Sequence, residues 1–422
     1  MTRSLNVWCN LEQVGTLSEV NDIWTFEYSH DWSGFELSPD LPSGTKIIDG
    51  SSFRSVQWFF DNLLPEEGAR ALLASDAGIG VADNFGLLEH FGAESAGAFT
   101  LLAPDETQVE GGEKELPFKD LSARIQNLPH SPLSTGSSKR MSLAGAQHKL
   151  PLIYRDGRLY EAISATPSTH ILKPEHSDPA AFYNTVVNEW FVMRLAAECG
   201  LNVPPVEMLS VPEPVYLIER FDREIAGDTL NRLHTIDALQ LLGISRAFKY
   251  TQCSLENLSK LIERCRESAK TRTQIFNWLV FNFLVGNDDD HLKNLSFFAV
   301  AGGYQLTPHY DLLCTVLYKN PEGTNWNDRK PVWPLTETNK RGKVTHKDLI
   351  AVGVGLGMKE AGARTLLKQL CAKLTASIDA LYQQAHDKMK SDKIDGPRME
   401  GELRLLRQII AVSKEAAAQV IV

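Results

Sequence analysis

The first hundred residues alternate between two hydrophobic patterns. Apolar and polar side chains alternate one by one in some stretches, which predicts strands. In other stretches apolar residues recur every three or four positions, which predicts helices. We therefore expect a small α+β subdomain over residues 1–102. The predicted strands are Leu5–Leu11, Ile23–Tyr28 and Ala98–Leu102, and the predicted helices are Val56–Leu64, Pro65–Ala74 and Asn84–Phe91.

The pattern changes twice in the next 130 residues. Residues 103–140 are polar and rich in Gly, Ser and Pro, which predicts a linker or surface segment. Residues 141–231 are rich in strands, and Asp156-Gly157 predicts a hairpin. One helix interrupts them and ends before Gly200. The predicted strands are Lys149–Tyr154, Arg158–Ala162, Thr169–Lys173, Val206–Val211 and Val215–Phe221, and the helix is Phe182–Cys199.

From residue 232 to 422 the chain is mostly helical. Thr235 and Ser254 are predicted N-caps, and Thr273–Val285 is a long apolar helix. Residues 345–422 predict three or more helices. The predicted fold class is thus α+β: a two-lobed, protein-kinase-like fold with a β-rich nucleotide-binding lobe (141–231), a helical catalytic lobe (232–422) and the extra N-terminal subdomain.

Composition narrows the functional classes. The 422 residues carry a formal net charge of −10, which argues against unaided binding to DNA or anionic membranes. The six scattered cysteines predict reduced thiols. No apolar run reaches the roughly 18 residues of a membrane span, and the start lacks a signal-peptide pattern. We expect a cytoplasmic protein without a membrane partner.

The informative segment is Gly286–Asn294, which contains three consecutive aspartates between the apolar helix and a predicted strand. Adjacent carboxylates repel one another, so the simplest interpretation of the three aspartates is a solvated surface turn without a functional role. Asp289 and Asn294, however, have the D-x-x-x-x-N spacing of a kinase catalytic loop. A predicted hairpin, Leu295–Val300 and Tyr304–Thr307, then leads to Asp311.

Phosphoryl transfer explains this spacing. A carboxylate must orient the attacking hydroxyl and accept its proton, which Asp289 could do. Oxygen ligands must hold Mg²⁺ against the phosphates of ATP, which Asn294 and Asp311 could do. Lys293 could neutralise the transferring phosphate. These assignments predict an ATP-dependent kinase.

The other lobe supplies further candidates. Lys173, at the end of a predicted strand, is a candidate anchor for ATP phosphates, although a solvated lysine is an equal alternative. Glu175, Glu189 and Glu198 could each orient it. No G-x-G-x-x-G motif precedes Lys173, and the segment Ser142–Lys149 is the best substitute for a phosphate-binding loop.

Two patterns are interpreted as structural. Gly353, Gly355 and Gly357 lack the context of a dinucleotide fingerprint and predict helix packing or a helix end. His291 has no second His or Cys at ligand spacing, which favours a hydrogen-bonding role over metal binding.

Taken together, these motifs resemble the HipA-like serine/threonine kinases, the toxins of HipBA-type toxin–antitoxin systems. The resemblance is nearly full length. It rests on Phe60-Asp-Asn-Leu-Leu-Pro65, Gly97-Ala-Phe-Thr-Leu101, Ser142-Leu-Ala-Gly-Ala-Gln-His-Lys149, Thr169-His-Ile-Leu-Lys173, Asn188-Glu189, Leu201-Asn-Val-Pro204, Glu219-Arg-Phe-Asp-Arg223, Asp289-Asp-His-Leu-Lys-Asn294 and Leu306-Thr-Pro-His-Tyr-Asp311.

The resemblance implies roles for individual residues. It implies that Asp289 is catalytic, that Asp311 binds Mg²⁺ and that Ser142 is autophosphorylated. A phosphate on Ser142 would add about −1.5 to −2 charges beside the ATP phosphates and silence the kinase. The implied nucleotide contacts are Ala144, Gly145, Ala146, Gln147, His148, Lys149, Lys173, the hinge Glu219, Arg220 and Phe221, and then His291, Leu292, Lys293, Asn294, Tyr310 and Asp311.

The resemblance also implies partners. These are a helix-turn-helix, HipB-like antitoxin that reaches operator DNA, and a protein substrate such as an aminoacyl-tRNA synthetase. The sequence departs from the family pattern at Asp290, where some relatives have glycine, and at His148, where an acidic residue is frequent. Two alternatives remain: a small-molecule or lipid phosphotransferase, and an inert kinase-like corepressor that acts with an antitoxin.

Overall fold

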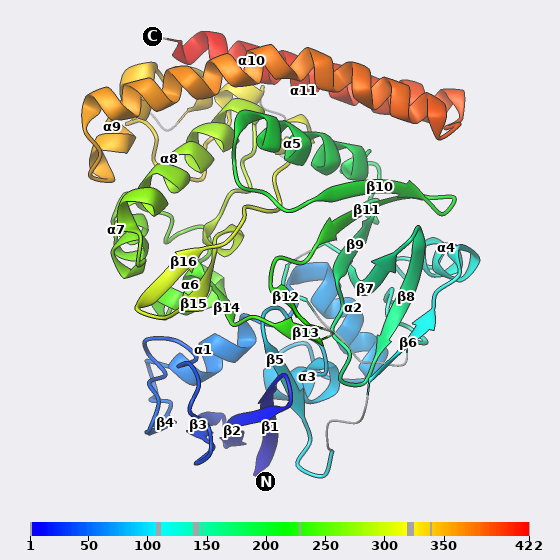
Figure 1. Ribbon diagram of the computed structural model, residues 1–422, viewed down its shortest axis with the longest axis vertical. Coiled ribbons are helices and arrows are strands. Elements are labelled where there is room, and N and C mark those ends of the chain that lie inside the picture. The colour runs from blue at the N-terminus through cyan, green and yellow to red at the C-terminus, as the bar shows by residue number, and fades with distance from the viewer. Residues whose placement is uncertain are drawn as a thin grey trace. The chain divides into compact units, whose positions relative to one another are not determined.

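The computed structural model describes residues 2–421 except 107–110, 138–142, 146, 228, 319–324 and 338–339. The chain forms two compact units (Figure 1). Unit 1 comprises residues 1–177, 209–248 and 296–300, and unit 2 comprises residues 178–208, 249–295 and 301–422. Each unit is built from segments that are distant in the sequence, which is how loop residues far apart along the chain can share a site.

The first part of unit 1 is an antiparallel sheet in the order β4-β3-β2-β1-β5. Its inner face is apolar because buried and less buried residues alternate along β1. Trp24 of β3 packs edge-to-face on Phe85 of α3, with 5.2 Å between ring centroids. The elements are β1 (Arg3–Cys9), β2 (Glu12–Val20), β3 (Ile23–Tyr28), β4 (Lys46–Ile48), β5 (Phe99–Leu102), α1 (Ser55–Asp61), α2 (Glu67–Ala77) and α3 (Asn84–Phe91).

The second sheet of unit 1 has the order β10-β11-β9-β7-β8-β6. The predicted Asp156-Gly157 hairpin joins β7 to β8, and both turn residues have positive φ, 52° and 74°. The strands are β6 (Gly112–Glu115), β7 (Leu150–Arg155), β8 (Arg158–Ile163), β9 (His170–Pro174), β10 (Val206–Ser210) and β11 (Pro214–Glu219).

Part of the polar segment 103–140 is built into this sheet. Strand β6 pairs with β8, and α4 (Phe118–Gln126) follows it. Leu116, Leu121 and Leu133 are buried in the same core as the leucines of β7 and β9. These three leucines anchor the segment in the core. The polar composition of the segment as a whole gives no sign of this anchoring.

The remaining elements of unit 1 follow β11. Thr235, predicted as an N-cap, instead begins a strand, so that prediction is wrong. Asp237 caps the next helix, because its carboxylate and the Gln240 side chain form a reciprocal capping box. The elements are β12 (Arg223–Ala226), β13 (Thr229–Arg232), β14 (Thr235–Asp237), α6 (Ala238–Leu242), η1 (Arg246–Phe248) and β15 (Ser296–Val300).

Unit 2 is helical. The two long helices α10 and α11 lie side by side (Figure 1), and both contact α5 and α8. The predicted cap Ser254 is confirmed, since its hydroxyl accepts from Asn257 N–H at the start of α7. The elements are α5 (Thr185–Cys199), α7 (Leu255–Arg264), α8 (Ser268–Val285), η2 (Leu292–Asn294), β16 (Gly303–Leu306), η3 (Thr315–Leu317), η4 (Trp326–Asp328), η5 (Arg341–Lys343), α9 (His346–Gly355), α10 (Glu360–Ser391) and α11 (Gly396–Val420).

All six cysteines are buried free thiols. Burial raises the pKa of Cys9, Cys265 and Cys371 to about 11 and that of Cys199, Cys253 and Cys314 to about 12. Among the described residues, no helix is both long and apolar enough to cross a bilayer.

Gly353 confirms its structural interpretation and generates a prediction. A Cβ there would lie 2.7 Å from Ala363 Cβ and 3.0 Å from the Phe276 ring, so α9 packs closely at this point. Gly353→Leu is expected to lower the free energy of unfolding by about 1–3 kcal/mol. The control is Gly362→Ala in α10, where a Cβ meets nothing within 4 Å. This substitution should raise the free energy of unfolding by roughly 0.5–1 kcal/mol. Urea denaturation measures both, and equal effects would contradict the packing argument.

Candidate functional site

The apolar helix α8 ends at the predicted catalytic loop. Gly286 terminates it with φ +73°, and a Cβ there would lie 2.6 Å from Val316 Cγ2. Only glycine satisfies both the conformation and the space. Residues 287 and 290–294 are buried in unit 2, Asp288 and Asp289 are half-buried, and the loop ends in the short helix η2. The loop is therefore not a fully solvated surface turn.

Asp289 and Asn294, the two residues of the kinase-like spacing, are joined directly. Asn294 Nδ2 donates to the Asp289 carbonyl at 2.8 Å, which closes the loop. The Asp289 N–H donates to Asn287 Oδ1 at 3.0 Å. The Asp289 carboxylate accepts a 2.5 Å hydrogen bond from the Tyr250 hydroxyl. The loop thus holds the middle aspartate by both its backbone and its side chain.

Asp288 has a structural partner. Arg341 Nη2 donates to Asp288 Oδ1 at 2.8 Å, and Arg329 Nε lies 3.7 Å from Asp288 Oδ2. Arg341 is almost fully buried, and it also donates to the carbonyls of Phe283 and Asn287. One guanidinium therefore binds the end of α8 and the first aspartate of the loop together.

Asp290 points to a different environment from Asp289. It is buried, and its carbonyl accepts from Trp333 Nε1 at 2.7 Å. Burial and the neighbouring Asp288 raise the pKa of Asp290 well above its usual value, although Arg341 opposes the shift. In these surroundings the neutral form of the Asp290 carboxyl group is favoured over its usual balance.

The segment carrying Asp311 lies beside this loop. The Tyr310 hydroxyl donates to the Lys293 carbonyl at 2.7 Å, which brings both predicted site residues together. Asp311 itself has φ +58°, an uncommon conformation that aspartate tolerates better than most residues. Such backbone strain often accompanies functional positions.

The donor set fits a magnesium ion held mainly by phosphates. Since Asn294 donates with its amide nitrogen, its amide oxygen is the atom suited to ligation. Asp311 adds a carboxylate from the adjacent segment. Within the described part of the chain, no group of three or more His, Cys, Asp or Glu is placed to hold a metal. Mg²⁺ commonly uses one or two protein oxygens together with substrate phosphates.

His291 and Leu292 complete the loop. Both are buried, and the His291 ring packs edge-to-face on the Tyr250 ring, 4.9 Å between centroids. The Leu292 N–H donates to the Lys249 carbonyl at 3.3 Å. Tyr250 and Lys249 therefore hold two sides of the loop.

In unit 1, the predicted phosphate-binding loop is tightly folded. Gly145 has φ +111°, and a Cβ there would lie 2.5 Å from Lys149 Nζ. Lys149 Nζ donates to the Ala144 carbonyl at 2.6 Å, and Gln147 Nε2 donates to the Pro174 carbonyl at 3.2 Å. The second bond ties the loop to the end of β9, next to Lys173.

Three further residues of this loop were predicted to have functional roles. Ser142 and Ala146 lie outside the described residues. His148 is partly buried, and burial together with His176 lowers its pKa, which favours the neutral imidazole.

Lys173 and the predicted hinge lie on paired strands. Lys173 is buried on β9 and pairs in register with Tyr216 of β11, its Nζ 5.8 Å from the Tyr216 ring centroid. Glu219, at the end of β11, pairs with His170. Along β11, Glu219 lies three residues beyond Tyr216, the partner of Lys173. At roughly 3.4 Å per residue, Glu219 is therefore about 10 Å from the level of Lys173. That spacing suits an elongated nucleotide.

The hinge residues Arg220 and Phe221 differ in their surroundings. Phe221 packs edge-to-face on Phe298 of β15, 5.9 Å between centroids. The Arg220 side chain instead enters a buried ion cluster, where it binds Asp222 with bonds of 2.9 and 2.7 Å. An ATP contact by Arg220 would accordingly come from its backbone.

Asp222 is the acidic centre of this cluster. Burial alone would raise the pKa of Asp222, but Arg220, Arg223 and the Gly97 N–H outweigh it and lower the pKa to about 2. Gly97 N–H donates to Asp222 Oδ2 at 2.8 Å. The charged carboxylate is therefore the form that the fold stabilises.

Several supporting residues carry no signal in the sequence. Each reaches the loop from a distant part of the chain, so neither spacing nor hydrophobic pattern marks it. They are Tyr250 on Asp289, Arg341 on Asp288, Trp333 on Asp290 and Thr315, whose hydroxyl accepts from the Asp288 N–H.

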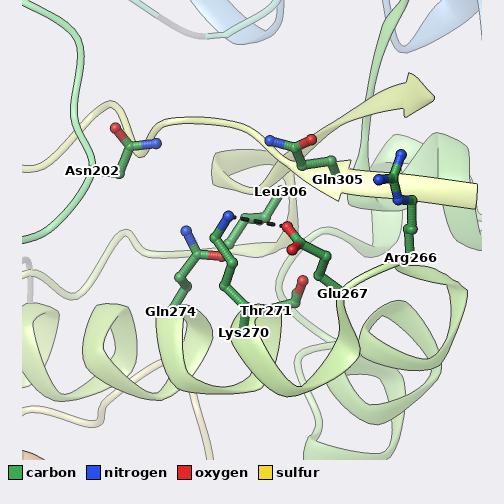
Figure 2. Close-up of a pocket in the computed structure, with 8 residues that line it drawn as sticks. All are labelled: Asn202, Arg266, Glu267, Lys270, Thr271, Gln274, Gln305 and Leu306. Atoms are coloured by element: carbon green, nitrogen blue, oxygen red, sulfur yellow. Dashed lines mark hydrogen bonds and ion pairs between the residues drawn. The ribbon is translucent and has the colours of Figure 1, made fainter.

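A polar cavity of about 320 Å³ lies at the other end of α8 (Figure 2). Figure 2 shows Lys270 reaching toward Glu267 within the first turn of the helix, a 3.0 Å ion pair, with Gln305 of β16 opposite. None of the predicted site residues lines it. The helix thus carries this cavity at its start and the catalytic loop at its end.

Comparison with known proteins identifies the family of the chain. Residues 5–102 match the model of the HipA N-terminal domain, and residues 141–378 match that of the HipA-like C-terminal domain. The chain is 39% identical over 335 residues to Y4mE of Sinorhizobium fredii, which is named as a kinase, covering 75% of this chain and 78% of that protein. It is 32% identical over 322 residues to the serine/threonine-protein kinase toxin HipA of Shewanella oneidensis, covering 71% and 72%.

A solved structure gives the same result. The HipA chain from the Shewanella oneidensis complex of HipA, HipB and operator DNA superposes with a TM-score of 0.81 at 26% identity, covering 99% of this chain and 97% of that one. This fold is that of a kinase-like protein, which confirms the predicted α+β, two-lobed fold class. The chain belongs to the HipA-like family of kinase toxins.

The Arg341–Asp288 pair generates a prediction. Arg341→Met should lower the free energy of unfolding by about 3–5 kcal/mol, because it leaves the buried Asp288 carboxylate without its main cation. The control is Lys340→Met, which breaks an exposed pair with Asp328 that is worth less than about 1 kcal/mol. Thermal and urea unfolding measure both, and a similar small loss in each would refute the proposed anchor.

Asp222 predicts a pH dependence. Its folded-state pKa of about 2 lies below the usual 3.8, so its contribution to stability is complete above about pH 4 and disappears as the pH falls toward 2. The difference corresponds to about 2 kcal/mol. Urea unfolding from pH 5 to pH 3 should show a steeper loss for the wild type than for Asp222→Asn. If stability fell equally with pH in the wild type and in Asp222→Asn, protonation of Asp222 would not be coupled to unfolding.

Proposed function

We propose that this protein is an ATP-dependent serine/threonine protein kinase and the toxin of a HipBA-type toxin–antitoxin system. One observation carries the proposal. The Tyr310–Lys293 and Asn294–Asp289 hydrogen bonds bring the predicted base and both predicted magnesium ligands into one small region of unit 2. The family membership supports the same activity.

Asp289 is the catalytic carboxylate in this proposal. It orients the hydroxyl of a substrate serine or threonine and accepts its proton as the oxygen attacks the γ-phosphate. The Tyr250 hydroxyl donates to Asp289 Oδ1 at 2.5 Å and so restrains the side-chain rotamer of the proposed base. Lys293 offsets negative charge on the phosphoryl group during transfer.

Further groups of each unit are proposed to bind ATP or Mg²⁺. Asn294 and Asp311 would hold Mg²⁺, which when bound neutralises charge on the phosphates. In unit 1, Lys173 and the N–H groups of the loop at Gly145 and Lys149 would bind the phosphates, and the hinge at Glu219–Phe221 would bind the adenine. The paired strands β9 and β11 position these groups.

Partners are proposed on two grounds. The Shewanella oneidensis relative is seen with HipB and operator DNA, which supports a HipB-like helix-turn-helix antitoxin here. The net charge of −10 favours contact with DNA mainly through that antitoxin. A translation protein such as an aminoacyl-tRNA synthetase is the proposed substrate, because the family includes kinases of that specificity.

Loss of the carboxylate at position 289 tests the catalytic assignment. Asp289→Asn should reduce autophosphorylation and kcat by about 10²–10⁴-fold, because an amide cannot accept the hydroxyl proton. The control is Asp290→Asn, the same substitution at the neighbouring buried aspartate, which has no role in the proposed chemistry. Phosphorylation with labelled ATP and Mg²⁺ is the measurement, with a bacterial lysate as the source of substrate.

Two results would refute parts of this proposal. Full activity of the Asp289 variant would remove the catalytic assignment. Label appearing on a small metabolite alone, with none on protein, would favour a small-molecule phosphotransferase.

A further inference from the structure

Glu94 is a buried carboxylate of the N-terminal domain (residues 5–102) that binds three arginines. Its Oε1 accepts from Arg220 Nη1 at 3.2 Å and from Arg223 Nη2 at 3.0 Å, and its Oε2 accepts from Arg232 Nη2 at 3.0 Å. Ser168 Oγ donates to Oε1 at 2.9 Å. Only 1% of Glu94 is exposed, so this is an interior ion cluster rather than a surface pair.

Two arginines of this cluster flank the predicted hinge. Arg220 and Arg223 stand one residue before and two residues after Phe221. Arg220 also binds the Ser95 carbonyl at 3.1 Å, and Arg223 binds the Gly97 carbonyl at 3.1 Å. Both sides of the hinge are thereby fastened to the segment between α3 and β5.

A second contact joins the same domain to the other end of the nucleotide-binding lobe. The Glu66 N–H donates to the Gly145 carbonyl at 3.0 Å, and Pro65 and Gly145 form a parallel β-bridge. Gly145 is the glycine of the predicted phosphate-binding loop that has φ +111°. The N-terminal domain therefore contacts both the loop that would bind phosphate and the hinge that would bind adenine.

We propose that Glu94 is a positioning residue for ATP: through Arg220 and Arg223 its carboxylate fixes the hinge in the shape that receives the adenine. The N-terminal domain is on this account part of the nucleotide site rather than an appendage to it. The inference rests on the proposed kinase function. It assigns Glu94 no contact with ATP.

Charge balance explains why a carboxylate is needed. The cluster holds three guanidinium groups and two carboxylates, Glu94 and Asp222. Without the charge of Glu94, Arg232 would lose its carboxylate partner, and Asp222 would have to balance both Arg220 and Arg223. Arg220 and Arg223 would then shift, and the hinge backbone between them would move. Small displacements of positioning groups can weaken function by an order of magnitude or more.

The test compares two Glu→Gln variants of buried ion pairs in unit 1. Glu94→Gln removes the charge at the hinge. Glu161→Gln is the control, because Glu161 is 2% exposed and pairs with Arg124 at 2.7 Å on β8, away from the hinge segment. Calorimetric titration with ATP and Mg²⁺ gives the Kd, and thermal unfolding verifies that each variant is folded at the assay temperature.

We expect the Kd for ATP to rise about 10-fold in Glu94→Gln and to change less than about 2-fold in Glu161→Gln, although both lower Tm. Equal Kd values for the two variants would overturn the proposal and leave Glu94 a purely structural residue. Absence of ATP binding by the wild type would instead refute the proposed kinase function, so the two failures are distinguishable.

A milder variant decides the question if Glu94→Gln does not fold. Ser168 Oγ donates to Glu94 and accepts from Arg220 Nη1 at 3.0 Å, so Ser168→Ala loosens the same contact without burying a charge. Its Kd for ATP should rise about 3-fold. An unchanged Kd in folded Ser168→Ala would overturn the proposal.

Discussion

A single buried guanidinium allows an aspartate-rich loop to exist in the interior of unit 2. Three consecutive carboxylates repel one another, and burial strengthens that repulsion because the effective dielectric constant falls. Arg341 neutralises Asp288 and also binds carbonyls at the end of α8. The three aspartates of the loop therefore differ in their surroundings: Asp288 binds Arg341, Asp289 accepts from Tyr250, and burial disfavours the charged form of Asp290.

Local rules recovered the features that depend on neighbouring residues. The Asp156-Gly157 hairpin, the cap at Ser254 and the helix end at Gly200 follow from turn and capping chemistry, and the structure contains all three. Local rules failed where two caps competed: Thr235 and Asp237 are two residues apart, and the capping box with Gln240 decides for Asp237. The kinase-like spacing of Asp289 and Asn294 was visible because both lie in one loop.

The supporting contacts could not be predicted, because they join distant residues. Arg341 lies 53 positions from Asp288, and Glu94 lies 126 positions from Arg220. A lone arginine or glutamate in a sequence most often lies on the surface, so nothing distinguishes these from the many other charged residues. Only the fold shows which charges are buried together. The roles of the site residues in ATP binding and catalysis stay predictions for the experiments above.

The six buried thiols have a practical consequence. The thiolate is the reactive form of cysteine, and pKa values of about 11 to 12 leave almost none of it near neutral pH. The folded protein should therefore react very slowly with maleimide reagents. One cysteine introduced on the surface of each unit would then be labelled selectively with a dye pair, without first removing any native residue. Such a pair would report by fluorescence transfer the distance between the two labelled positions.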